Sequence, residues 1–576
     1  MNNKTCQNCK KNFVVDAEDV AYYEMMHVPH PTLCPECRLV RRLAVRNERS
    51  LHKRTCAKCQ KSVLSLYAQD SSYIVYCNSC WWSDDWDPTQ FAKEYDPSRS
   101  FFEQFNELYQ LVPQPALHNL YQTLENSEYA NMAGSLKNCY LLFNSDYSES
   151  CSYGTEVEHS KECFDNVMME ECELSYDNVN CLKCYEVFCS TDLEACHGVY
   201  FSRNLSGCSS CFGCVNLRSK QYHIYNEPYT KEGYEAKLKE IDFKTQKSIA
   251  EIKKKVDDLA LAYPQKYMHE KQNKDASGDY ITNSEDVVSS FVTTGARHCR
   301  YCLWMIVKPV NDCWDFTQYG DKAERVYEMI MSGNGLQECM FSYYCLNEVA
   351  RVQYCVKCYN TSDLFGCVGI RQKQYCILNK EYPKKEYEEL KAKIIARMKA
   401  SGEYGEFFPI SISPYGYNET SAQELAPLTK ERALAKGYKW RDMEEKAHQP
   451  SKSWNELPAI ENTTDEILKD TILCRAWDEN LEQAQQHNCS KAFRLTLNEL
   501  NFYKRFSLPL PEKCPNSRHH DRLQRRNPFK LWHRSCVCVQ AHPQHDGQCP
   551  AEFETAYSPE SKQLVYCKEC YQAEVL

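Results

Sequence analysis

Eight cysteines near the start of the chain have the spacing of metal ligands. They form four Cys-x-x-Cys pairs, which in chain order are Cys6/Cys9, Cys34/Cys37, Cys56/Cys59 and Cys77/Cys80. Each pair turns the backbone tightly enough to aim two thiolates at one ion, and two pairs complete a tetrahedral Cys₄ shell. The spacing therefore predicts two zinc ribbons, the first formed by the first two pairs and the second by the last two.

Iron and disulfides are the alternatives at these pairs. A Cys₄ shell also holds iron in rubredoxin, whose pairs usually continue with Gly after the second Cys. Here Lys10 and Arg38 follow the second Cys of a pair, and large charged residues at those places favour a structural ribbon over an electron carrier.

Length and composition limit the class of protein. The chain has 576 residues, 36 Cys and a formal net charge of −10, and so many residues can bury a large core without disulfide staples. No apolar run approaches the roughly 18 residues of a membrane span, and no signal-like segment follows Met1. We therefore expect a cytoplasmic protein with no membrane contact, in which thiols stay reduced and clustered cysteines indicate metal.

The C-terminal region repeats the first ribbon pair. An offset of 480 takes Cys9 to Cys489, Cys34 to Cys514 and Cys56 to Cys536; after a ten-residue insertion, an offset of 490 takes Cys59, Cys77 and Cys80 to Cys549, Cys567 and Cys570. This predicts a third zinc site, formed by Cys549, Cys567, Cys570 and either Cys536 or Cys538. About three zinc ions per chain are therefore expected.

The first site of the C-terminal pair is degraded. Gln486 and Ser517 stand where the first ribbon has Cys6 and Cys37, which leaves Cys489 and Cys514. His487, His519 and His520 are possible replacement ligands. The pattern favours a half-site that binds no metal and persists through packing.

Both ribbon pairs carry a basic segment between their knuckles. Residues 38–54 contain seven Lys or Arg against one Glu, and residues 518–534 contain six against one Asp. A guanidinium fork suits phosphate, so these segments predict contact with nucleic-acid backbone, with internal structural arginines as the alternative. The candidate nucleic-acid-binding residues are Arg38, Arg41, Arg42, Arg46, Arg518, Arg522, Arg525 and Arg526.

The middle of the chain is repetitive. Cysteines recur at 139, 151, 163, 172, 184, 196 and 208, and short runs rich in Tyr, Phe and Val follow many of them. Short strands with evenly spaced polar turns predict a β-solenoid, with about two segments per coil and a ladder of small thiols in a narrow core. An offset of 153 takes Phe212-Gly213-Cys214-Val215 to Phe365-Gly366-Cys367-Val368, so the module is duplicated, and each copy runs into a helix expected to cap an open solenoid end.

Several central pairs also resemble metal motifs. They are Cys181/Cys184, Cys208/Cys211/Cys214, Cys299/Cys302 and Cys355/Cys358. The triple could belong to an iron–sulfur centre, but the internal copy retains only the equivalent of Cys214. Packing is therefore favoured over metal for the central thiols.

The expected fold is mainly β with helical additions, in which terminal zinc ribbons flank a duplicated Cys-rich β-solenoid-like region. The predicted divisions are 1–85 tandem zinc ribbons, 86–130 helical linker, 131–228 solenoid module A, 229–275 amphipathic helix, 276–382 solenoid module B, 383–402 helix, 403–470 irregular linker with a short charged helix near 428–447, and 471–576 C-terminal tandem ribbon. Whether the two modules share one core is left open.

The combination of motifs resembles a known group of proteins. Cys34-Pro-Glu-Cys37-Arg38, Arg41-Arg42-Leu43, Val75-Tyr76-Cys77, the Phe101-Phe-Glu-Gln-Phe segment and Cys549-Pro-Ala-Glu-Phe-Glu-Thr with Tyr566-Cys-Lys-Glu-Cys-Tyr carry the likeness. They resemble uncharacterised zinc-ribbon, Cys-rich repeat proteins of candidate-phyla-radiation (Patescibacteria) bacteria. The resemblance implies a bacterial, cytosolic, zinc-binding protein and implies no activity.

The sequence favours a non-enzymatic zinc-binding scaffold whose basic ribbons contact nucleic acid or a ribonucleoprotein. One alternative is a redox or electron-transfer protein that uses Cys₄ iron or the central thiols, and another is a protein–protein interaction scaffold with purely structural zinc. Hydrolysis at an open zinc site is disfavoured, because only His519-His520-Asp521 and His542/His545 offer suitable neighbours and no catalytic set accompanies them. The sequence leaves the oligomeric state open.

Overall fold

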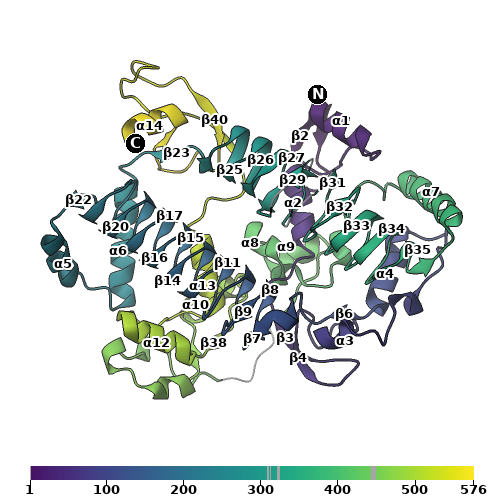
Figure 1. Cartoon of the computed structure of the whole chain (residues 1–576), viewed down its shortest axis with the longest axis horizontal. Helices are drawn as coiled ribbons and strands as arrows, with labels where there is room; N and C mark the ends of the chain where they lie inside the picture. Colours follow the sequence, from purple (N-terminus) through teal and green to yellow (C-terminus); the bar gives the residue numbers. More distant parts are fainter. Residues whose placement is uncertain are drawn as a thin grey trace.

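The computed structural model describes residues 2–575 except 308–309, 312, 319, 321–322, 324 and 443–448. Two β-solenoid modules form its centre, and Cys-rich ribbons from both ends of the chain pack against them (Figure 1). The predicted fold class is therefore confirmed: the protein is mainly β, with helices added at the ends and sides of the solenoids. In the described part of the chain, no helix is both long and apolar enough to cross a membrane.

Module A is a stack of short parallel strands in two seven-stranded sheets. The first sheet contains β8 (Asn131–Gly134), β10 (Phe143–Asp146), β11 (Thr155–Glu158), β13 (Val167–Glu170), β15 (Val179–Leu182), β17 (Thr191–Glu194) and β19 (Arg203–Ser206). The second contains β12 (Lys161–Phe164), β14 (Glu173–Tyr176), β16 (Tyr185–Phe188), β18 (His197–Tyr200), β20 (Ser209–Phe212), β21 (Gln221–Ile224) and the antiparallel edge strand β22 (Glu227–Pro228). Thr155 pairs with Val167 and Val167 with Val179, so each coil takes 12 residues.

A three-residue period underlies this coil. The φ angle is positive at every third residue from Met132 to Tyr225, and every third residue from Cys139 to Cys214 is buried. Each coil therefore turns through four corners and points four side chains inward. Asn and Asp, which tolerate the left-handed region best among non-glycine residues, occupy several corners, as at Asp165, Asp177 and Asn204.

The inward positions explain the cysteine ladder. The cysteine steps of 9 and 12 in the sequence are multiples of three, so these thiols all point into the core, with Ser, Asn, Val and Leu at the remaining inward places. The Sγ of Cys196 donates to the carbonyl oxygens of Glu194 and Leu205 at 3.3 and 3.6 Å. The Oδ1 of Asn178 likewise accepts from the backbone N–H of Ser190 at 2.8 Å. Small polar side chains thus fill a narrow core and bond its inward-facing backbone.

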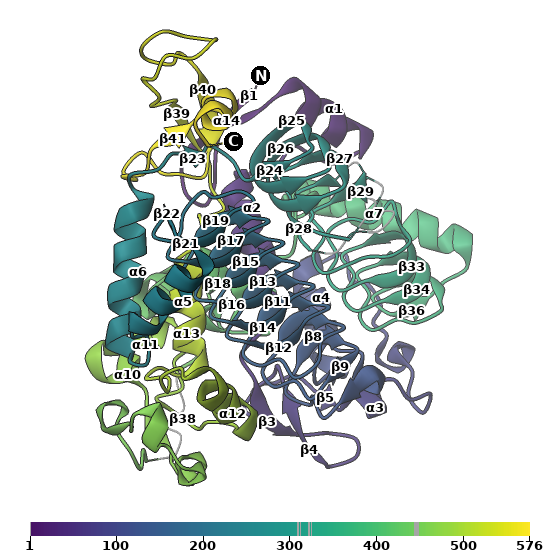
Figure 2. The same cartoon turned by 60° about the vertical axis from the view of Figure 1, so that its left-hand side comes forward.

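Module B repeats this architecture less regularly. Its strands are β24 (Glu270–Lys271), β25 (Lys274–Thr282), β26 (Glu285–Thr294), β27 (Ala296–Arg300), β28 (Leu303–Met305), β29 (Val310–Asn311), β30 (Cys313–Trp314), β31 (Val326–Tyr327), β32 (Leu336–Gln337), β33 (Leu346–Gln353), β34 (Tyr359–Phe365), β35 (Gln374–Ile377) and β36 (Lys380–Glu381). Cys313 pairs with Val326, a coil of 13 residues, whereas Ser362 pairs with Gln374, a coil of 12. The two modules lie side by side with separate cores (Figure 2).

Helices flank the solenoids. Residues 229–275 contain two helices, α5 (Lys231–Glu240) and α6 (Gln246–Ala260); α5 and α7 (Lys384–Ser401) pack at the last coils of modules A and B. Helix α6 instead lies along the side of module A, where Ile249, Ile252 and Val256 are buried. Further elements between these parts include η1 (Pro88–Phe91), α4 (Phe101–Leu111), β6 (Gln114–Pro115), β7 (Leu124–Glu125), β9 (Leu136–Lys137), β23 (Gln265–Lys266), α8 (Ser421–Leu425) and α9 (Lys430–Ala435). Part of the helix predicted near 428–447 lies outside the described residues.

The ribbons form at both ends of the chain. The first pair comprises β1 (Asn2–Thr5), β2 (Asn12–Val15), α1 (Ala17–Met25), α2 (Pro35–Leu43), β3 (His52–Thr55), β4 (Ser62–Ser65), β5 (Val75–Tyr76) and α3 (Asn78–Trp81). The C-terminal pair comprises β37 (Ile472–Leu473), α10 (Arg475–Glu479), α11 (Leu481–Gln486), β38 (Ala492–Phe493), α12 (Leu497–Phe506), α13 (Pro515–Leu523), β39 (Trp532–Ser535), β40 (Glu552–Thr555), β41 (Val565–Tyr566) and α14 (Lys568–Val575).

A partly buried histidine joins the two modules. The Nδ1 of His269 lies 2.8 Å from Asp279 of module B, its Nε2 lies 3.7 Å from Asp192 of module A, and its ring stacks on Tyr280. Burial alone would lower the pKa of His269, but Asp279 and Asp192 outweigh it and raise the pKa to about 9. The imidazolium therefore links acidic groups of both modules at neutral pH.

The narrow core predicts a steric test at Cys196. Cys196→Leu should lower the free energy of unfolding by about 1–3 kcal/mol, because the added carbons overpack a core that already holds three other inward side chains per coil. Cys196→Ser should change it by no more than about 1 kcal/mol, since serine occupies equivalent inward places. Urea titrations would measure both, with His197→Leu, the next residue along and exposed on the same coil, as control. Equal tolerance of leucine at both positions would contradict the inward placement.

The His269 link predicts a pH dependence of stability. Because its pKa is higher in the folded protein than the ordinary 6.5, its contribution is complete below about pH 6.5 and is lost as the pH rises through about 9. The difference corresponds to at most about 3 kcal/mol. Urea midpoints measured from pH 6 to pH 10 should fall for the wild type more than for His269→Gln, with His197→Gln as control. Parallel curves for all three proteins would refute the link.

Candidate metal centres

The first N-terminal ribbon gathers its four predicted ligands. The thiols of Cys6, Cys9, Cys34 and Cys37 lie within 4.8 Å of one another. The Sγ atoms of Cys9 and Cys34 are 3.7 Å apart, close to the about 3.8 Å edge of a tetrahedron with zinc–sulfur bonds of about 2.3 Å. Cys6 and Cys9 come from the turn of the β1–β2 hairpin, while Cys34 is the N-cap of α2, so an ion here fixes the start of that helix.

The second ribbon repeats this geometry. Its group consists of Cys56, Cys59, Cys77 and Cys80. The Sγ atoms of Cys59 and Cys77 are 3.7 Å apart, and the N–H of Cys77 donates to the Sγ of Cys56 at 3.1 Å. A backbone N–H bond to a ligand sulfur stabilises the thiolate form that a metal requires.

The third group contains Cys536 and not Cys538, the two cysteines that the sequence offered as its fourth ligand. Cys536, Cys549, Cys567 and Cys570 lie together, and Cys538 is not among them. The N–H of Cys567 donates to the Sγ of Cys536 at 3.2 Å, as Cys77 does to Cys56. Cys538 instead belongs to a separate group with His542, His545 and Cys570.

The degraded site contains a ligand that the offset did not identify. Cys474 joins Cys489 and Cys514 in a buried group, and the N–H of Cys514 donates to the Sγ of Cys474 at 3.1 Å, just as Cys34 donates to Cys6. Cys474 therefore replaces Cys6 although it lies 15 residues before Cys489, because α10 and α11 occupy the intervening chain.

Serine takes the fourth place at this site. The Oγ of Ser517 lies 3.4 Å from the Sγ of Cys514 and 3.7 Å from that of Cys474. His487, His519 and His520 do not belong to the group, and the rings of His487 and His520 stack on each other instead. Three thiols could still hold an ion here, so the prediction of a metal-free half-site stays a prediction.

The central cysteines are buried packing groups. No disulfide joins them, and the groups suited to a metal among the described residues all lie in the terminal ribbons. Cys181, Cys184, Cys299 and Cys302 are among the cysteines in the two solenoid cores. Their burial in the cores supports packing at these pairs, and the preference for packing over metal stays a prediction.

The predicted nucleic-acid-binding arginines of the first ribbon are buried. Both Arg38 and Arg42 contact the carboxylate of Asp315, with Arg42 at 3.1 Å, and Arg41 contacts Glu328 at 2.6 Å. Arg46 pairs with Glu48 and lies over the ring of Trp304. These side chains are at most 8% exposed. They join α2 to module B, so they do not offer a surface to phosphate.

The arginines of the C-terminal pair make the equivalent contacts with module A. Arg518 and Arg522 bind Asp165 at 2.7 and 2.9 Å, and Arg525 binds Asp177 at 2.8 Å. The guanidinium of Arg526 lies over the ring of Phe529 and 3.8 Å from the Sδ of Met168. The acidic corners of the solenoid already neutralise the charge at three of these arginines, which disfavours nucleic-acid contact here too, and that contact stays a prediction.

The two interfaces match residue by residue. Arg38 lies over Tyr301, whose hydroxyl donates to Asp19; Arg518 lies over Tyr153, whose hydroxyl donates to Glu499. Asp19 and Glu499 differ by the ribbon offset of 480. The arginine contacts are therefore crossed: the arginines of α2 reach module B and those of α13 reach module A. Strand β40 of the second C-terminal ribbon, in contrast, packs against β25 of module B. In the sequence, the two arginine interfaces are marked by pairs of acidic residues one coil apart, Asp165 with Asp177 and Asp315 with Glu328.

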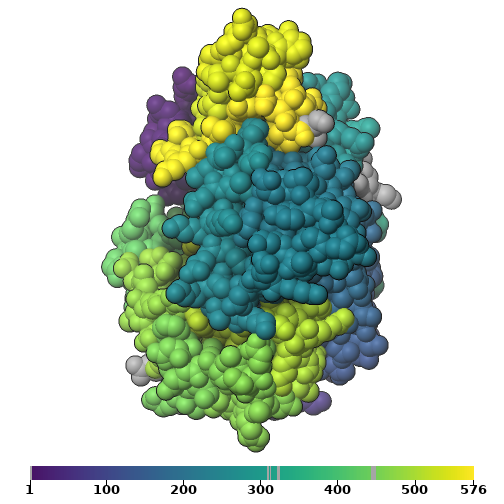
Figure 3. All heavy atoms as spheres, turned by 90° about the vertical axis from the view of Figure 1, so that its left-hand side faces the viewer, coloured from purple at the N-terminus to yellow at the C-terminus, as the bar shows by residue number. Residues whose placement is uncertain are grey.

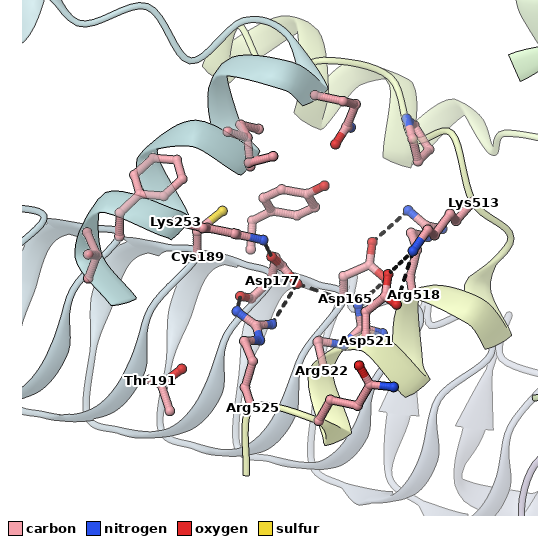
Figure 4. A pocket seen from close by; sticks show the side chains of 18 of the residues that line it. Asp165, Asp177, Cys189, Thr191, Lys253, Lys513, Arg518, Asp521, Arg522 and Arg525 are labelled. Atoms are coloured by element: carbon pink, nitrogen blue, oxygen red, sulfur yellow. Dashed lines mark hydrogen bonds and ion pairs between the residues drawn. The ribbon is translucent and has the colours of Figure 1, made fainter. Parts of the chain in front are cut away.

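A cavity of about 430 Å³ lies beside the C-terminal clamp, between α6, α13 and the coils of module A (Figure 4). Lys253 and Arg525 point toward Asp177 from opposite sides. Burial alone would raise the pKa of Asp177, but Arg525, Lys253 and Arg522 hold it well below its usual range. Lys513 pairs with Asp521 at the rim, so many of the lining charges are neutralised within the chain.

The clamp predicts a large effect at Asp165. Asp165→Asn should lower the free energy of unfolding by about 3–5 kcal/mol, because it leaves Arg518 and Arg522 buried without their main counter-charge. Glu162→Gln is the matched control on the same coil: it breaks a partly exposed pair with Arg505 and should cost at most about 1 kcal/mol. Urea titrations compare the two. Similar costs would show that Asp165 does not carry the clamp.

Comparisons with known proteins do not place the chain in a family. No family model and no curated protein matches it. Among solved structures, a putative acetyltransferase from Desulfovibrio desulfuricans G20 shares 8% identity over 43% of this chain and 65% of its own, with a TM-score of 0.10. A likeness this low carries no inference about fold or function.

Proposed function

We propose that the protein is a non-enzymatic scaffold in which structural zinc ions keep the terminal ribbons folded, and the folded ribbons clamp the two solenoid modules. The observation that supports this most is the set of three Cys₄ groups, each with four thiols within 4.8 Å of one another. Four protein ligands fill a tetrahedral shell and leave no position for water, which is typical of structural zinc and not of catalytic zinc.

Metal binding and clamping are linked through the helices. Helix α2 begins at the ligand Cys34, and its arginines reach Asp315 and Glu328 of module B. In the C-terminal pair, α13 begins at Cys514 in the same way and reaches Asp165. At α2, an ion that fixes Cys34 would therefore also fix the direction of the guanidinium groups; at α13, Cys514 belongs to the three-thiol group, where packing is expected to do the same.

This proposal replaces nucleic-acid contact with internal assembly as the role of the basic segments. Six of the eight candidate arginines pair with carboxylates of the modules, and a seventh, Arg46, pairs with Glu48 of the ribbon itself. The outer faces of the rigid solenoids remain available to a protein partner, so the scaffold interpretation rests on shape and stability and not on a charged surface.

The proposal is tested by metal content and by removal of one ligand. The purified full-length protein should contain zinc and no iron, and should be colourless. Cys9→Ser should remove one zinc ion per chain, because three thiols bind the ion less tightly than four, and should increase hydrogen exchange in α2 and in the coil that carries Asp315.

Cys196→Ser is the matched control, since its thiol lies in the solenoid core and should not change the metal content. Visible absorption from iron would instead support the electron-transfer alternative. A chain that contains no metal, or a Cys9→Ser protein with the same metal content and unchanged exchange in α2, would refute the proposed role of zinc.

A further inference from the structure

The insertion in the C-terminal ribbon contains a second set of metal ligands. In the first ribbon pair Cys56 and Cys59 are three positions apart, whereas their equivalents Cys536 and Cys549 are 13 apart. The added chain brings one Cys and two His, Cys538, His542 and His545, that have no counterpart in the first pair. An insertion that only lengthened a loop would not need these residue types.

The inserted segment folds back onto the ribbon. His542 and His545 form an antiparallel bridge, with N–H to carbonyl distances of 2.9 and 3.2 Å. This turn brings the Nε2 of His545 to 3.1 Å from the Sγ of Cys570, and the Nε2 of His542 to 3.2 Å from the Sγ of Cys538. The ribbon lies at one end of the molecule, in the yellow lobe at the top of Figure 3.

Hydrogen bonding selects the tautomer of His545 that binds metal. Its Nδ1 lies 2.8 Å from the carbonyl oxygen of Gly547. A carbonyl only accepts, so Nδ1 must carry the proton, and the lone pair of Nε2 then points toward Cys570. The Nε2 of His542 also lies 3.5 Å from Glu574, and the side chain of His542 is 7% exposed.

The two groups share one residue. Cys538, His542, His545 and Cys570 lie within 4.8 Å of one another, and Cys570 also belongs to the Cys₄ group of Cys536, Cys549 and Cys567. Cys536, Cys538 and Cys570 are all buried, with at most 1% exposure. The N···S distances are somewhat shorter than the about 3.6 Å edge expected around zinc, so the group can open slightly to accept an ion.

From this geometry we propose that the C-terminal ribbon holds two zinc ions bridged by the thiolate of Cys570. One ion takes Cys536, Cys549, Cys567 and Cys570, and the other takes Cys538, His542, His545 and Cys570. A thiolate sulfur has lone pairs for two cations, so seven residues complete two tetrahedral shells. Thiolate and imidazole ligands in tetrahedral sets favour zinc.

Sharing Cys570 between two zinc ions also reduces the net charge of the site. Four thiolates around one zinc ion leave a formal charge of −2, whereas five thiolates and two neutral imidazoles around two zinc ions leave −1. A smaller net charge costs less to bury. The second ion would therefore stabilise the first. The N-terminal ribbons hold one ion each and lack this stabilisation.

The test compares metal counts in full-length variants by native mass spectrometry. Because this proposal rests on the proposed zinc ribbons, the measured quantity is the number of ions per chain that each variant loses relative to the wild type. The double variant Cys538→Ser/His545→Ala should lose one ion and keep the others. His533→Ala is the matched control in the same ribbon, since its exposed ring pairs with Glu552 and Glu554 and should leave the count unchanged.

Cadmium substitution tests the bridge itself. With ¹¹³Cd in place of zinc, two resonances coupled to each other through the shared sulfur are expected, and the double variant should lose one resonance and the coupling. An unchanged ion count in the double variant, or two uncoupled resonances, would overturn the proposal while leaving the ribbons intact. Absence of metal from the whole chain would instead refute the proposed function.

Discussion

The buried arginine–carboxylate clamp is the interaction on which the assembly depends. At each of two interfaces, arginines from one ribbon helix reach an aspartate at a corner of a solenoid coil: Arg38 and Arg42 reach Asp315, and Arg518 and Arg522 reach Asp165. Charges removed from water are stable only when paired and well hydrogen-bonded. The clamp therefore requires that the ribbon helix, the coil and the neighbouring tyrosine all occupy their places together.

This requirement explains the crossed arrangement of the chain. Because the arginines of α2 bind module B, those of α13 bind module A, and β40 packs against β25 of module B, the two ends of the chain hold both modules (Figure 1). The His269 link between Asp192 and Asp279 adds a direct contact between modules.

The same residue type serves two physical roles. In the ribbons, cysteines meet in groups whose sulfur separations of 3.7–4.0 Å suit a tetrahedral ion. In the solenoids they stand in columns, and the inward-facing thiols donate to nearby carbonyl oxygens, as Cys196 does. Left-handed corners at every third residue are costly for non-glycine residues, and the continuous hydrogen-bonded stack of coils together with this filled core offsets that cost.

The sequence by itself determined the ribbon ligands and the solenoid class, because both are local patterns: Cys-x-x-Cys spacing sets ligand geometry, and the 12-residue recurrence sets the coil. It did not reveal the three-residue period, since Ser, Asn, Val and Leu replace Cys at many inward positions. Only the tertiary structure decided whether the arginines face solvent or pair with carboxylates inside the protein, because their partners Asp315 and Asp165 are more than 270 residues away along the chain. It also brought Cys474 to the degraded site and separated Cys536 from Cys538, since insertions change sequence spacing while the folded backbone keeps ligand positions.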